Sequence, residues 1–435
     1  MSTIAKKIAF HTLGCKLNFS ETSTLSRDSL KYGYEKVDSK EFADIYVFNT
    51  CSVTENANKE TRKLIRRSKR INPNAFITLI GCYAQLKPEE LIDIEEVNLV
   101  LGMEDKFELL SHLDKINFQE NTKSSYSGSI NNVKTFEPSY SKDDRTRSFL
   151  KVQDGCDYNC TFCTIPLARG KSRSTSIKKI VNIAKDISNT NTKEIVLTGV
   201  NIGDFGNGAN ENFYDLIRQL DKNVDIERIR ISSIEPNLLN DEIIEFCFSS
   251  KKLMPHFHMP LQSGSDRMLK SMKRRYTTGL YLDRIDKIKS LDQDACIGVD
   301  VIVGYPTESD EDFLATYNFL KSKDVSYLHV FTYSERENTE AVNLKPVVPH
   351  SERSRRSKIL HELSDQKKSA FYEKSVGKIK TVLIEKSKNG ALFGYTDNYV
   401  KTKIQGPISL ENTIQSVFIS EAKLGYVECE VLTIS

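Results

Sequence analysis

The chain alternates short apolar runs with longer helical patterns, and this alternation constrains the fold more than any other feature. In the first part of the chain, apolar runs at 7–12, 44–49, 75–80 and 98–101 are separated by helical patterns at about 21–32 and 55–71. Strands that alternate with helices form parallel sheets. Residues 1–118 are therefore predicted to form an α/β domain around a parallel sheet.

The same alternation returns in the middle of the chain. Six apolar runs with helical patterns between them lie at 149–152, 194–197, 228–232, 256–259, 296–303 and 327–331. A complete βα barrel has eight strands, so residues 146–373 are predicted to form a partial (β/α)6 barrel. The intervening residues 119–145 are rich in Ser, Asn, Lys and Asp, and we interpret them as a linker.

The last part of the chain has a different pattern. A charged helix is predicted at about 347–375, with a solvated basic face near its start. Short β runs follow at 379–385, 391–395, 399–404, 413–419 and 426–432. Five short strands predict a small all-β barrel over residues 374–435, of the kind that binds oligonucleotides. The fold class is α/β, with this small barrel as a third domain.

Composition excludes several classes of protein. The hydrophobic content of 39% and the charged content of 28% are usual for a globular protein, and a net charge of +3 does not by itself indicate nucleic acid. The first residues do not resemble a signal peptide, and no run approaches the roughly 20 apolar residues of a membrane span. A cytoplasmic protein with reduced cysteines is expected, not a secreted disulfide scaffold.

Residues 155–163 contain three of the nine cysteines, Cys156, Cys160 and Cys163, in the pattern CxxxCxxC. Three thiolates from one loop can hold three irons of a [4Fe–4S] cluster and leave the fourth iron open to a small molecule. A zinc site would normally have four ligands, and a disulfide would leave one cysteine unpaired. The spacing therefore favours a cluster that takes part in chemistry.

A second set of cysteines is spread over the first domain. Cys15, Cys51 and Cys82 each follow the end of a predicted strand, and the carboxyl ends of parallel strands share one edge of a sheet. The fold would thus bring three distant thiols together. Three unrelated buried cysteines are the alternative. Cys247, Cys296 and Cys429 show no such pattern and are interpreted as core or incidental residues.

Loops after four predicted strands of the middle domain are polar or contain glycine. They lie at 198–201, 232–236, 260–264 and 304–306. In βα barrels the chemistry lies at the face formed by the loops that follow the strands. These four loops and the triple-cysteine loop therefore predict a cofactor pocket at that face.

With these motifs, the chain resembles the radical S-adenosylmethionine (SAM) enzymes, whose hallmark is CxxxCxxC with an aromatic residue before the last cysteine. That residue is Phe162 here. The upstream three-cysteine domain and the small C-terminal barrel, called the TRAM domain in the family, make the whole chain similar to the methylthiotransferases. Other segments that fit the family are 165–166, 169–170, 173–174, 197–203, 232–236 and 260–265.

The first cysteine motif distinguishes three branches of that family. Residues 12–18 read TLGCKLN, which resembles the branch that modifies threonylcarbamoyladenosine in tRNA and has the pattern TLGCKxN. The branch that modifies isopentenyladenosine favours YGCQMN, and the branch that modifies an aspartate of a ribosomal protein favours LGCPKN. The motif at 49–54, followed by Arg62, Arg66 and Arg67, also fits the first branch.

The resemblance implies two [4Fe–4S] clusters and SAM as cofactors. Cys156, Cys160 and Cys163 would hold the cluster that cleaves SAM, and the set Cys15, Cys51 and Cys82 would hold an auxiliary cluster that carries sulfur. No side chain is expected to act as a catalytic group, because cofactors carry the chemistry. The candidates for contacts with SAM are Phe162, Gly199, Asn201, Ser233, Glu235, Gln262 and Asp300.

The resemblance also implies a partner, the anticodon stem–loop of tRNA, in which C2 of adenosine 37 would receive a methylthio group. A base in such a loop can be splayed out and read by stacking. Candidates for phosphate contact are Lys63, Arg66, Arg67, Lys69, Arg70, Lys273, Arg274 and Arg275, although solvated helix faces would look alike. An electron donor such as flavodoxin or ferredoxin, no membrane contact and a monomer are expected.

Two other interpretations stay open at this point. The same chemistry could act on isopentenyladenosine 37 or on a ribosomal-protein aspartate. The chain could also be a non-catalytic iron–sulfur protein that binds RNA.

Overall fold

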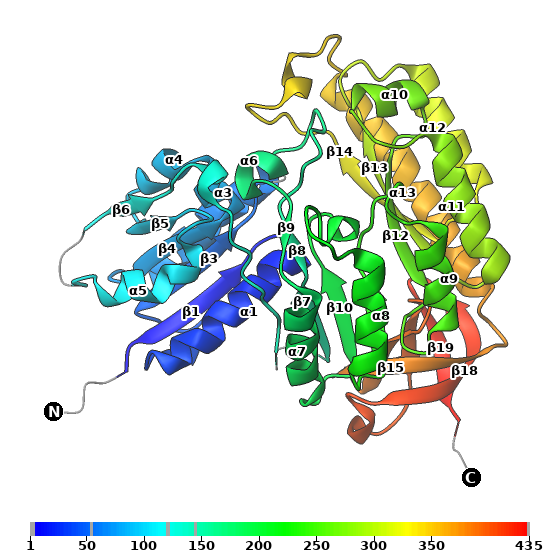
Figure 1. The fold of residues 1–435 in the computed structure, drawn as a ribbon, viewed down its shortest axis with the longest axis horizontal. Helices are drawn as coiled ribbons and strands as arrows, with labels where there is room; N and C mark the ends of the chain where they lie inside the picture. Colours follow the sequence, from blue (N-terminus) through cyan, green and yellow to red (C-terminus); the bar gives the residue numbers. More distant parts are fainter. Residues whose placement is uncertain (1–4, 53–54, 119–121, 143–145, 433–435) are drawn as a thin grey trace.

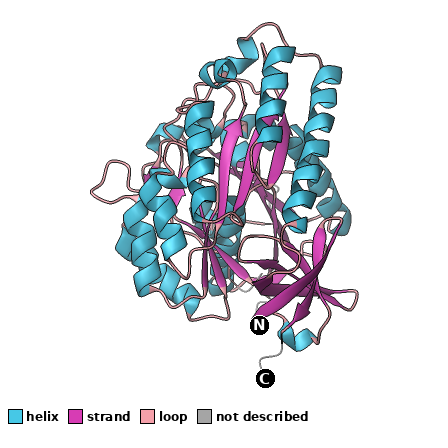
Figure 2. Ribbon diagram, turned by 90° about the vertical axis from the view of Figure 1, so that its right-hand side faces the viewer, coloured by secondary structure: helices cyan, strands magenta, loops and turns pink. Residues whose placement is uncertain are grey.

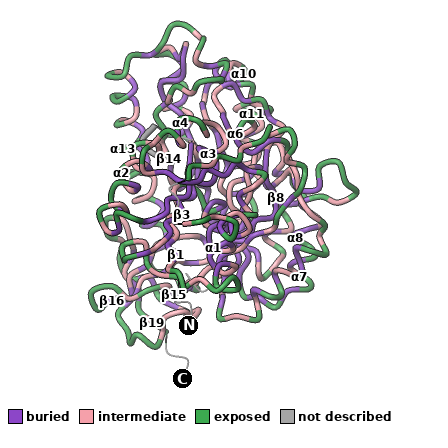
Figure 3. The backbone as a smooth tube through the Cα atoms, turned by 90° about the vertical axis from the view of Figure 1, so that its left-hand side faces the viewer, coloured by how far each residue is buried: buried purple, intermediate pink, exposed green. Residues whose placement is uncertain are grey.

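The computed structural model describes residues 5–52, 55–118, 122–142 and 146–432. The chain forms three successive parts, and Figure 1 shows the N-terminal sheet beside the middle barrel, with the small C-terminal barrel below it. Buried residues are concentrated in the interior of the molecule, and exposed residues follow its outer loops (Figure 3). Val53 and Thr54 of the second cysteine motif lie outside the described residues.

The first part is built on a parallel sheet of six strands in the order β2-β1-β3-β4-β5-β6. These strands are β1 Lys7–Thr12, β2 Glu35–Val37, β3 Ile45–Thr50, β4 Phe76–Gly81, β5 Leu99–Leu101 and β6 Ser124–Tyr126. The helices are α1 Lys16–Lys31, α2 Glu55–Ile71, α3 Cys82–Leu86, α4 Pro88–Ile92 and α5 Leu109–Asp114, with 3-10 turns at Lys106–Glu108 and Ile130–Asn132. Every residue of β3 and β4 is buried, as in parallel sheets covered on both faces.

Two elements of this part differ from the sequence prediction. The residues predicted to be a linker contain β6, which pairs with β5 in the register Leu99↔Ser124 through Leu101↔Tyr126. Backbone pairing with an open sheet edge accounts for this strand, because its side chains are polar. Helix α1 begins at Lys16, earlier than the predicted start, and its buried residues near that end include Asn18, Ser20 and Glu21. A polar buried face gives no hydrophobic periodicity from which to find the helix start.

The middle part is the predicted partial barrel. Its strands are β7 Arg147–Lys151, β10 Glu194–Thr198, β11 Arg228–Ile231, β12 His256–Gln262, β13 Cys296–Val303 and β14 Tyr327–Thr332. They form two three-stranded parallel sheets, β11-β10-β7 and β12-β13-β14. Two isolated β-bridges, Ile229↔Leu253 and Ser233↔His258, join the β11 side of the first sheet to the β12 side of the second. The strand order is thus β7-β10-β11-β12-β13-β14, with an open side between β7 and β14.

Helices cover the outside of this open barrel, as Figure 2 shows. They are α7 Ile177–Ser188, α8 Phe213–Asn223, α9 Asp241–Ser249, α10 Asp266–Ser271, α11 Thr278–Leu291, α12 Asp310–Ser322 and α13 His350–Glu373. Ser176, Asn212 and Asn240 begin three of them by accepting a hydrogen bond from a backbone N–H of the first turn. Alternate strand residues, such as Val299, Val301 and Leu328, pack with these helices in one hydrophobic core. The residues between them therefore point into the barrel.

The basic start of α13 is only partly solvated, contrary to the sequence interpretation. Arg353 and Arg356 are buried, and Arg356 pairs with the buried Glu308 at 2.7 Å. A charge run in sequence does not reveal such internal partners.

The C-terminal part is a closed barrel in the strand order β15-β16-β17-β19-β18, as predicted. Its strands are β15 Ile379–Lys388, β16 Ala391–Thr396, β17 Lys401–Ile404, β18 Ile414–Lys423 and β19 Tyr426–Val431. The turn after β16 closes the bottom of the middle barrel. Tyr399 stacks on His256 of β12 with ring centroids 4.3 Å apart, and Arg230 of β11 lies 5.0 Å from the same ring.

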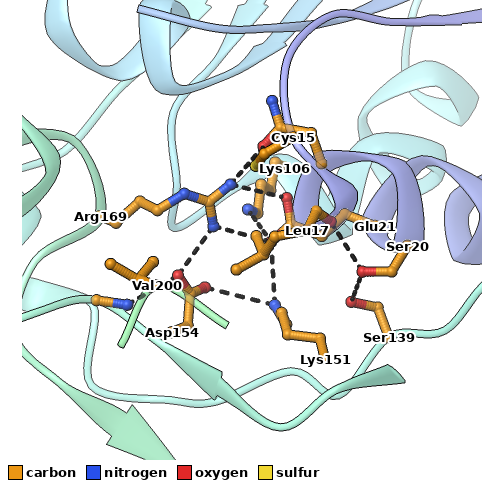
Figure 4. Close-up of polar contacts among 12 residues, drawn as sticks. Cys15, Leu17, Ser20, Glu21, Lys106, Ser139, Lys151, Asp154, Arg169 and Val200 are labelled. Carbon is orange, nitrogen blue, oxygen red and sulfur yellow. Dashed lines mark hydrogen bonds and ion pairs between the residues drawn. The ribbon is translucent and has the colours of Figure 1, made fainter. Parts of the chain in front are cut away.

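Helix α1 lies between the first sheet and β7 (Figure 1), and Phe19 packs edge-on against Phe149. A buried ionic cluster crosses this contact (Figure 4). Arg169 lies 3.1 Å from Glu21 of α1 and 2.9 Å from Asp154 of the middle part. Glu21 also pairs with Lys106 at 2.7 Å and Lys151 at 3.0 Å, and all five side chains are buried.

The cluster stays ionised although it is buried. Burial disfavours the charged form of Glu21, but Arg169, Lys106 and Lys151 outweigh it and hold the pKa of Glu21 well below its usual range. The pKa of Asp154 is lowered in the same way, against burial, by Arg169, Lys151 and Arg173. Burial lowers the pKa of Lys106 to about 8, although Glu21 opposes this shift.

Among the described residues, no helix is both long and apolar enough to cross a membrane.

Replacing Glu21 by Gln should strongly destabilise the contact between the first two parts. The substitution leaves three buried cations near Glu21 short of one negative charge, and breaking a buried pair in this way costs about 3–5 kcal/mol. Chemical denaturation followed by circular dichroism would measure the change in the free energy of unfolding.

Asp28→Asn on the same helix is the matched control. Asp28 pairs with Lys31 at 2.6 Å on the exposed surface, so its loss should cost less than about 1 kcal/mol. Equal effects of the two substitutions would show that the buried cluster does not stabilise the contact.

Candidate active site

The triple-cysteine loop follows the short strand β8 Gln153–Asp154 and leads into α6 Ile165–Arg169. The loop starts at Gly155, which has a φ of +70°. A Cβ there would come within 2.0 Å of the carbonyl oxygen of Lys171. Lys171 lies just before β9 Arg173–Ser174, the strand that pairs antiparallel with β8. Glycine is therefore required for the turn that presents Cys156.

Each sulfur of this loop accepts one N–H hydrogen bond. The backbone N–H of Tyr158 donates to Cys156 Sγ at 3.4 Å, and the backbone N–H of Ile165 donates to Cys163 Sγ at 3.5 Å. The guanidinium of Arg274 donates to Cys160 Sγ at 3.1 Å. Such bonds orient cysteine ligands and tune the charge on their sulfurs.

Burial disfavours the thiolate forms of these cysteines. It raises the pKa of Cys156 to about 11 and that of Cys163 to about 12. The pKa of Cys160 is also raised by burial, which the nearby charge of Arg274 partly offsets. Metal binding at this loop must therefore release protons as the thiols become thiolates.

The second cysteine set lies at one edge of the first sheet. The neighbouring parallel strands β1, β3 and β4 end just before Cys15, Cys51 and Cys82. A Cβ on Gly14, which has a φ of +97°, would lie 2.9 Å from Cys51 Sγ, so the loop after β1 passes directly over that thiol. Burial raises the pKa of Cys82 to about 11. The charge of Arg169 opposes this shift, and the nearby thiols of Cys51 and Cys15 add to it. The three thiols are thus close enough to influence one another.

Helix α6 joins the two cysteine sets. It begins directly after the triple-cysteine loop, and its Ala168 packs with Cys82 and Met103 in one small buried core. Its last residue, Arg169, carries the charge that acts on Cys82 and belongs to the ionic cluster of Figure 4. A single short helix therefore connects one cysteine set to the other.

A cavity of about 530 Å³ opens beside Cys163. Three predicted SAM contacts line it, Phe162, Gln262 and Asp300, together with residues of β14 and the loop after it. Gln262 has a φ of +64°, and its buried side-chain oxygen has no hydrogen-bond partner among the described residues. Non-glycine residues with positive φ and unpaired buried acceptors are often found at binding sites. The size is ordinary for a cofactor pocket of about 300–1,000 Å³.

The other predicted contacts do not line this cavity. A Cβ on Gly199 would meet the backbone and side-chain oxygens of Gln153 at 3.0 Å. Asn201 donates its backbone N–H to the same side chain at 2.8 Å, and its amide lies beside the Tyr158 hydroxyl. Ser233 bridges to β12 through His258. Glu235 pairs with Arg274 and so holds the guanidinium that contacts Cys160.

Arg274 lies beside the triple-cysteine loop and not on the surface, where the sequence placed it. It was expected among the phosphate contacts, but its side chain is only 4% exposed and binds Cys160 and Glu235. An RNA backbone cannot reach it there. The adjacent Lys273 pairs with Glu340 on the surface, and Arg275 lies 3.9 Å from the Tyr158 ring. Three consecutive basic residues look alike in sequence, and only the fold separates them.

The basic helix α2 remains compatible with phosphate contact. Lys63, Arg66, Arg67 and Arg70 line one shallow surface hollow with other residues of this helix. Lys69 instead donates to the backbone oxygens of Pro73 and Ala75.

The cysteine sets suit a multi-iron group better than a single ion. Within the described residues, the one group of metal-ligating atoms that converges within 4.8 Å is His258, Asp300 and His329. Neither cysteine set brings three sulfurs that close, and thiolates are the ligands that iron–sulfur clusters use.

Comparisons with known proteins agree with this geometry. Residues 7–102 match the family described as "Uncharacterized protein family UPF0004", and residues 150–320 match the Radical SAM superfamily. The threonylcarbamoyladenosine tRNA methylthiotransferase MtaB of Aquifex aeolicus is 41% identical over 92% of this chain and 97% of its own length. This chain belongs to the radical SAM methylthiotransferases.

The chain is also similar to a relative with a different printed substrate and to solved radical SAM structures. The tRNA-2-methylthio-N(6)-dimethylallyladenosine synthase of Aquifex aeolicus is 30% identical over 99% of this chain and 100% of its own length. Among solved structures, the radical S-adenosylmethionine methyltransferase TsrM of Kitasatospora setae is 12% identical, with a TM-score of 0.58 over 78% of this chain and 77% of that chain. This structural likeness shows the fold. Membership of the methylthiotransferase family implies a [4Fe–4S] cluster and SAM.

Replacing Arg274 by Gln should make the cluster of this methylthiotransferase harder to reduce. The guanidinium stabilises negative charge on Cys160 Sγ, and a charge-assisted hydrogen bond of ~1.4 kcal/mol corresponds to about 59 mV in a one-electron potential. A redox titration monitored by electron paramagnetic resonance should show a more negative midpoint potential.

Lys273→Gln provides the control, because Lys273 is exposed, adjacent in sequence and paired with Glu340. Its midpoint potential should stay close to that of the unchanged protein. A shift of similar size in both variants would contradict a specific role for Arg274.

Proposed function

We propose that this protein is a threonylcarbamoyladenosine tRNA methylthiotransferase, which inserts sulfur and a methyl group at C2 of adenosine 37 beside the anticodon. The observation that carries the proposal is the meeting of two three-cysteine sets at one short helix, α6. The near full-length similarity to MtaB supports the choice of substrate.

Three cysteines of one loop, Cys156, Cys160 and Cys163, would hold the cluster common to radical SAM enzymes. When bound, SAM and that cluster supply the radical chemistry that removes hydrogen from an unreactive carbon. The protein's own contribution is position. Tyr158, Ile165 and Arg274 orient the three sulfurs through N–H bonds, and Glu235 fixes Arg274.

The cavity beside Cys163 would take SAM. Phe162 would pack against its adenine, and the unpaired acceptor Gln262 Oε1 would accept a hydrogen bond from one of its polar groups. Asp300, which His258 and His329 contact, would line the same pocket. Gly199 and Asn201 would shape the methionine end through the side chain of Gln153, while Ser233 and Glu235 support the adjoining wall. Partly apolar walls with a few placed polar groups are usual in such pockets.

Cys15, Cys51 and Cys82 would hold a second [4Fe–4S] cluster, the carrier of the transferred sulfur. Cys15 is exposed while Cys51 and Cys82 are buried, so the site is closed at two of its thiols and open at the third. This arrangement suits a group that delivers an atom to a substrate placed between the two sites.

The tRNA stem–loop would lie against the C-terminal barrel and the basic face of α2. Stacking on aromatic rings and contacts from Lys and Arg to phosphates are the usual means of holding an extruded base and its backbone. We place the protein in the cytoplasm, as a monomer that receives electrons from a flavodoxin or a ferredoxin.

Two triple variants test the cluster assignment. Anaerobically reconstituted protein should hold about eight irons per chain, four in each cluster. Replacing Cys15, Cys51 and Cys82 together by Ala should leave about four irons and retain SAM cleavage to 5′-deoxyadenosine. Replacing Cys156, Cys160 and Cys163 should leave about four irons and abolish that cleavage.

About four irons in the unchanged protein would mean that the first set of cysteines holds no cluster. In that case the proposed sulfur carrier would be lost. Full iron loading without release of 5′-deoxyadenosine would favour a non-catalytic iron–sulfur protein.

Nucleoside analysis tests the substrate. Mass spectrometry of tRNA from a strain that lacks the protein should show loss of 2-methylthio-threonylcarbamoyladenosine and accumulation of threonylcarbamoyladenosine. Re-expression should restore the product. Unchanged levels of that nucleoside, with loss of the 2-methylthio-isopentenyl product or of a modified ribosomal aspartate, would assign the protein to another branch.

A further inference from the structure

The inner face of the open barrel carries a set of charged side chains next to the proposed SAM cavity, here called the charged chamber. Six ionisable residues alternate along the strands with residues that pack against the outer helices, so their side chains face inward. They are Arg147, Glu194, Arg230, His258, Asp300 and His329. The Tyr399 stack on His256 closes the chamber at the bottom. Asp300 also lines the cavity beside Cys163, so the two spaces adjoin.

Lys16 reaches this chamber from the first part of the chain. It is the first residue of α1 and directly follows Cys15. Charges of the chamber act on it, because Arg147, Arg230, Glu194 and Asp300 all influence Lys16 electrostatically. Lys16 in turn influences the buried His256. Lys16 lies one turn before Phe19, whose ring packs on the inward-facing Phe149 of β7. It therefore lies on the face of α1 that meets the open side of the barrel, and it is exposed to solvent.

Nearly all other charges of the chamber are neutralised within it. Arg230 binds Glu194 at 2.9 Å, and Arg147 binds Glu385 at 2.6 Å. Asp300 Oδ1 lies 2.8 Å from His258 Nε2 and 3.2 Å from His329 Nδ1. Lys16 differs, because no hydrogen bond or ion pair joins it to another residue in the described part of the chain.

The charges of the chamber favour a ligand that carries a carboxylate over a metal ion. His258, Asp300 and His329 could in principle hold a metal ion, since their ligand atoms lie within 4.8 Å. However, both imidazoles already bind the same Asp300 oxygen, and the unpaired cation Lys16 interacts electrostatically with that carboxylate. Like charges would repel a metal ion there. An unpaired ammonium beside an available carboxylate oxygen, Asp300 Oδ2, instead suits a ligand with one carboxylate and neighbouring O–H or N–H donors.

The proposed substrate has these groups next to its reacting carbon. A threonine joined through a carbamoyl group to the adenine amino group has a free carboxylate, a hydroxyl and amide N–H donors. The reacting C2 and the carbon that bears the substituted amino group belong to the same six-membered ring. The substituent must therefore lie beside the sulfur-delivering site, and Lys16 is the next residue after Cys15.

We propose that this chamber binds the threonylcarbamoyl substituent of the target adenosine, with its carboxylate against Lys16 and its hydroxyl or amide donors on Asp300. The proposal rests on the proposed function. His258 and His329 are positioning residues that hold the Asp300 carboxylate at the mouth of the SAM cavity.

Binding of two anticodon stem–loops tests the subsite without requiring turnover. One carries threonylcarbamoyladenosine and the other its methyl ester, which removes only the negative charge. Fluorescence anisotropy with the reconstituted, full-length protein should give a dissociation constant about tenfold lower for the free acid, since a charge-assisted hydrogen bond of ~1.4 kcal/mol corresponds to that factor. Equal affinities for the two would overturn the proposal, whether or not any variant folds.

Substitutions then assign the preference to Lys16. Lys16→Gln should reduce the ratio of the two dissociation constants to near 1, while Lys16→Arg should keep it. Lys31→Gln is the matched control at the other end of α1, where the lysine is exposed and pairs with Asp28, and it should also keep the ratio. A full preference for the free acid in Lys16→Gln would contradict the proposal.

Product analysis separates this test from that of the proposed function. If the unchanged protein methylthiolates an isopentenyladenosine stem–loop and not the threonylcarbamoyl one, the proposed function fails and the subsite fails with it. If it methylthiolates the threonylcarbamoyl substrate with equal affinity for acid and ester, only the subsite fails.

Discussion

The contact between the first two parts of this protein depends on a buried ionic cluster centred on Arg169. Its guanidinium holds Glu21 of the first part and Asp154 of the second, while Lys106 and Lys151 complete the charge balance (Figure 4). Since α6 ends at Arg169 and begins just after Cys163, the same cluster sets the distance and orientation between the two cysteine sets. The proposed active site is therefore built by this contact and by neither part alone.

A buried cluster of this kind is better suited to specify a geometry than to add stability. Removing five charged groups from water costs several kcal/mol each, and their mutual attraction regains that energy only when every partner is in place. Any displacement of the first part would leave charges unpaired. The apolar contacts around it, such as Phe19 on Phe149 and Cys82 on Ala168, tolerate small shifts more easily. The ionic cluster thus selects one arrangement of the two parts, which a reaction between two sites requires.

Much of the architecture could be predicted from the sequence, and the failures share one physical cause. Buried parallel strands are continuous apolar runs, so β3, β4 and β13 were found within about one residue of their observed bounds, well inside the usual error. The start of α1 was missed because its buried face is polar, and β6 was missed because it pairs through its backbone alone. Arg274 was assigned to RNA because burial cannot be read from a basic run. In each case, polar groups satisfied inside the fold look solvent-exposed in sequence.

The proposed reaction requires two separate clusters, one held by each cysteine set, on either side of α6. Anomalous diffraction at the iron absorption edge, from crystals of the anaerobically reconstituted protein, locates iron directly. We expect two iron peaks, one bounded by Cys156, Cys160 and Cys163 and the other by Cys15, Cys51 and Cys82. A single peak at the triple-cysteine loop, with no iron at the edge of the first sheet, would contradict this expectation.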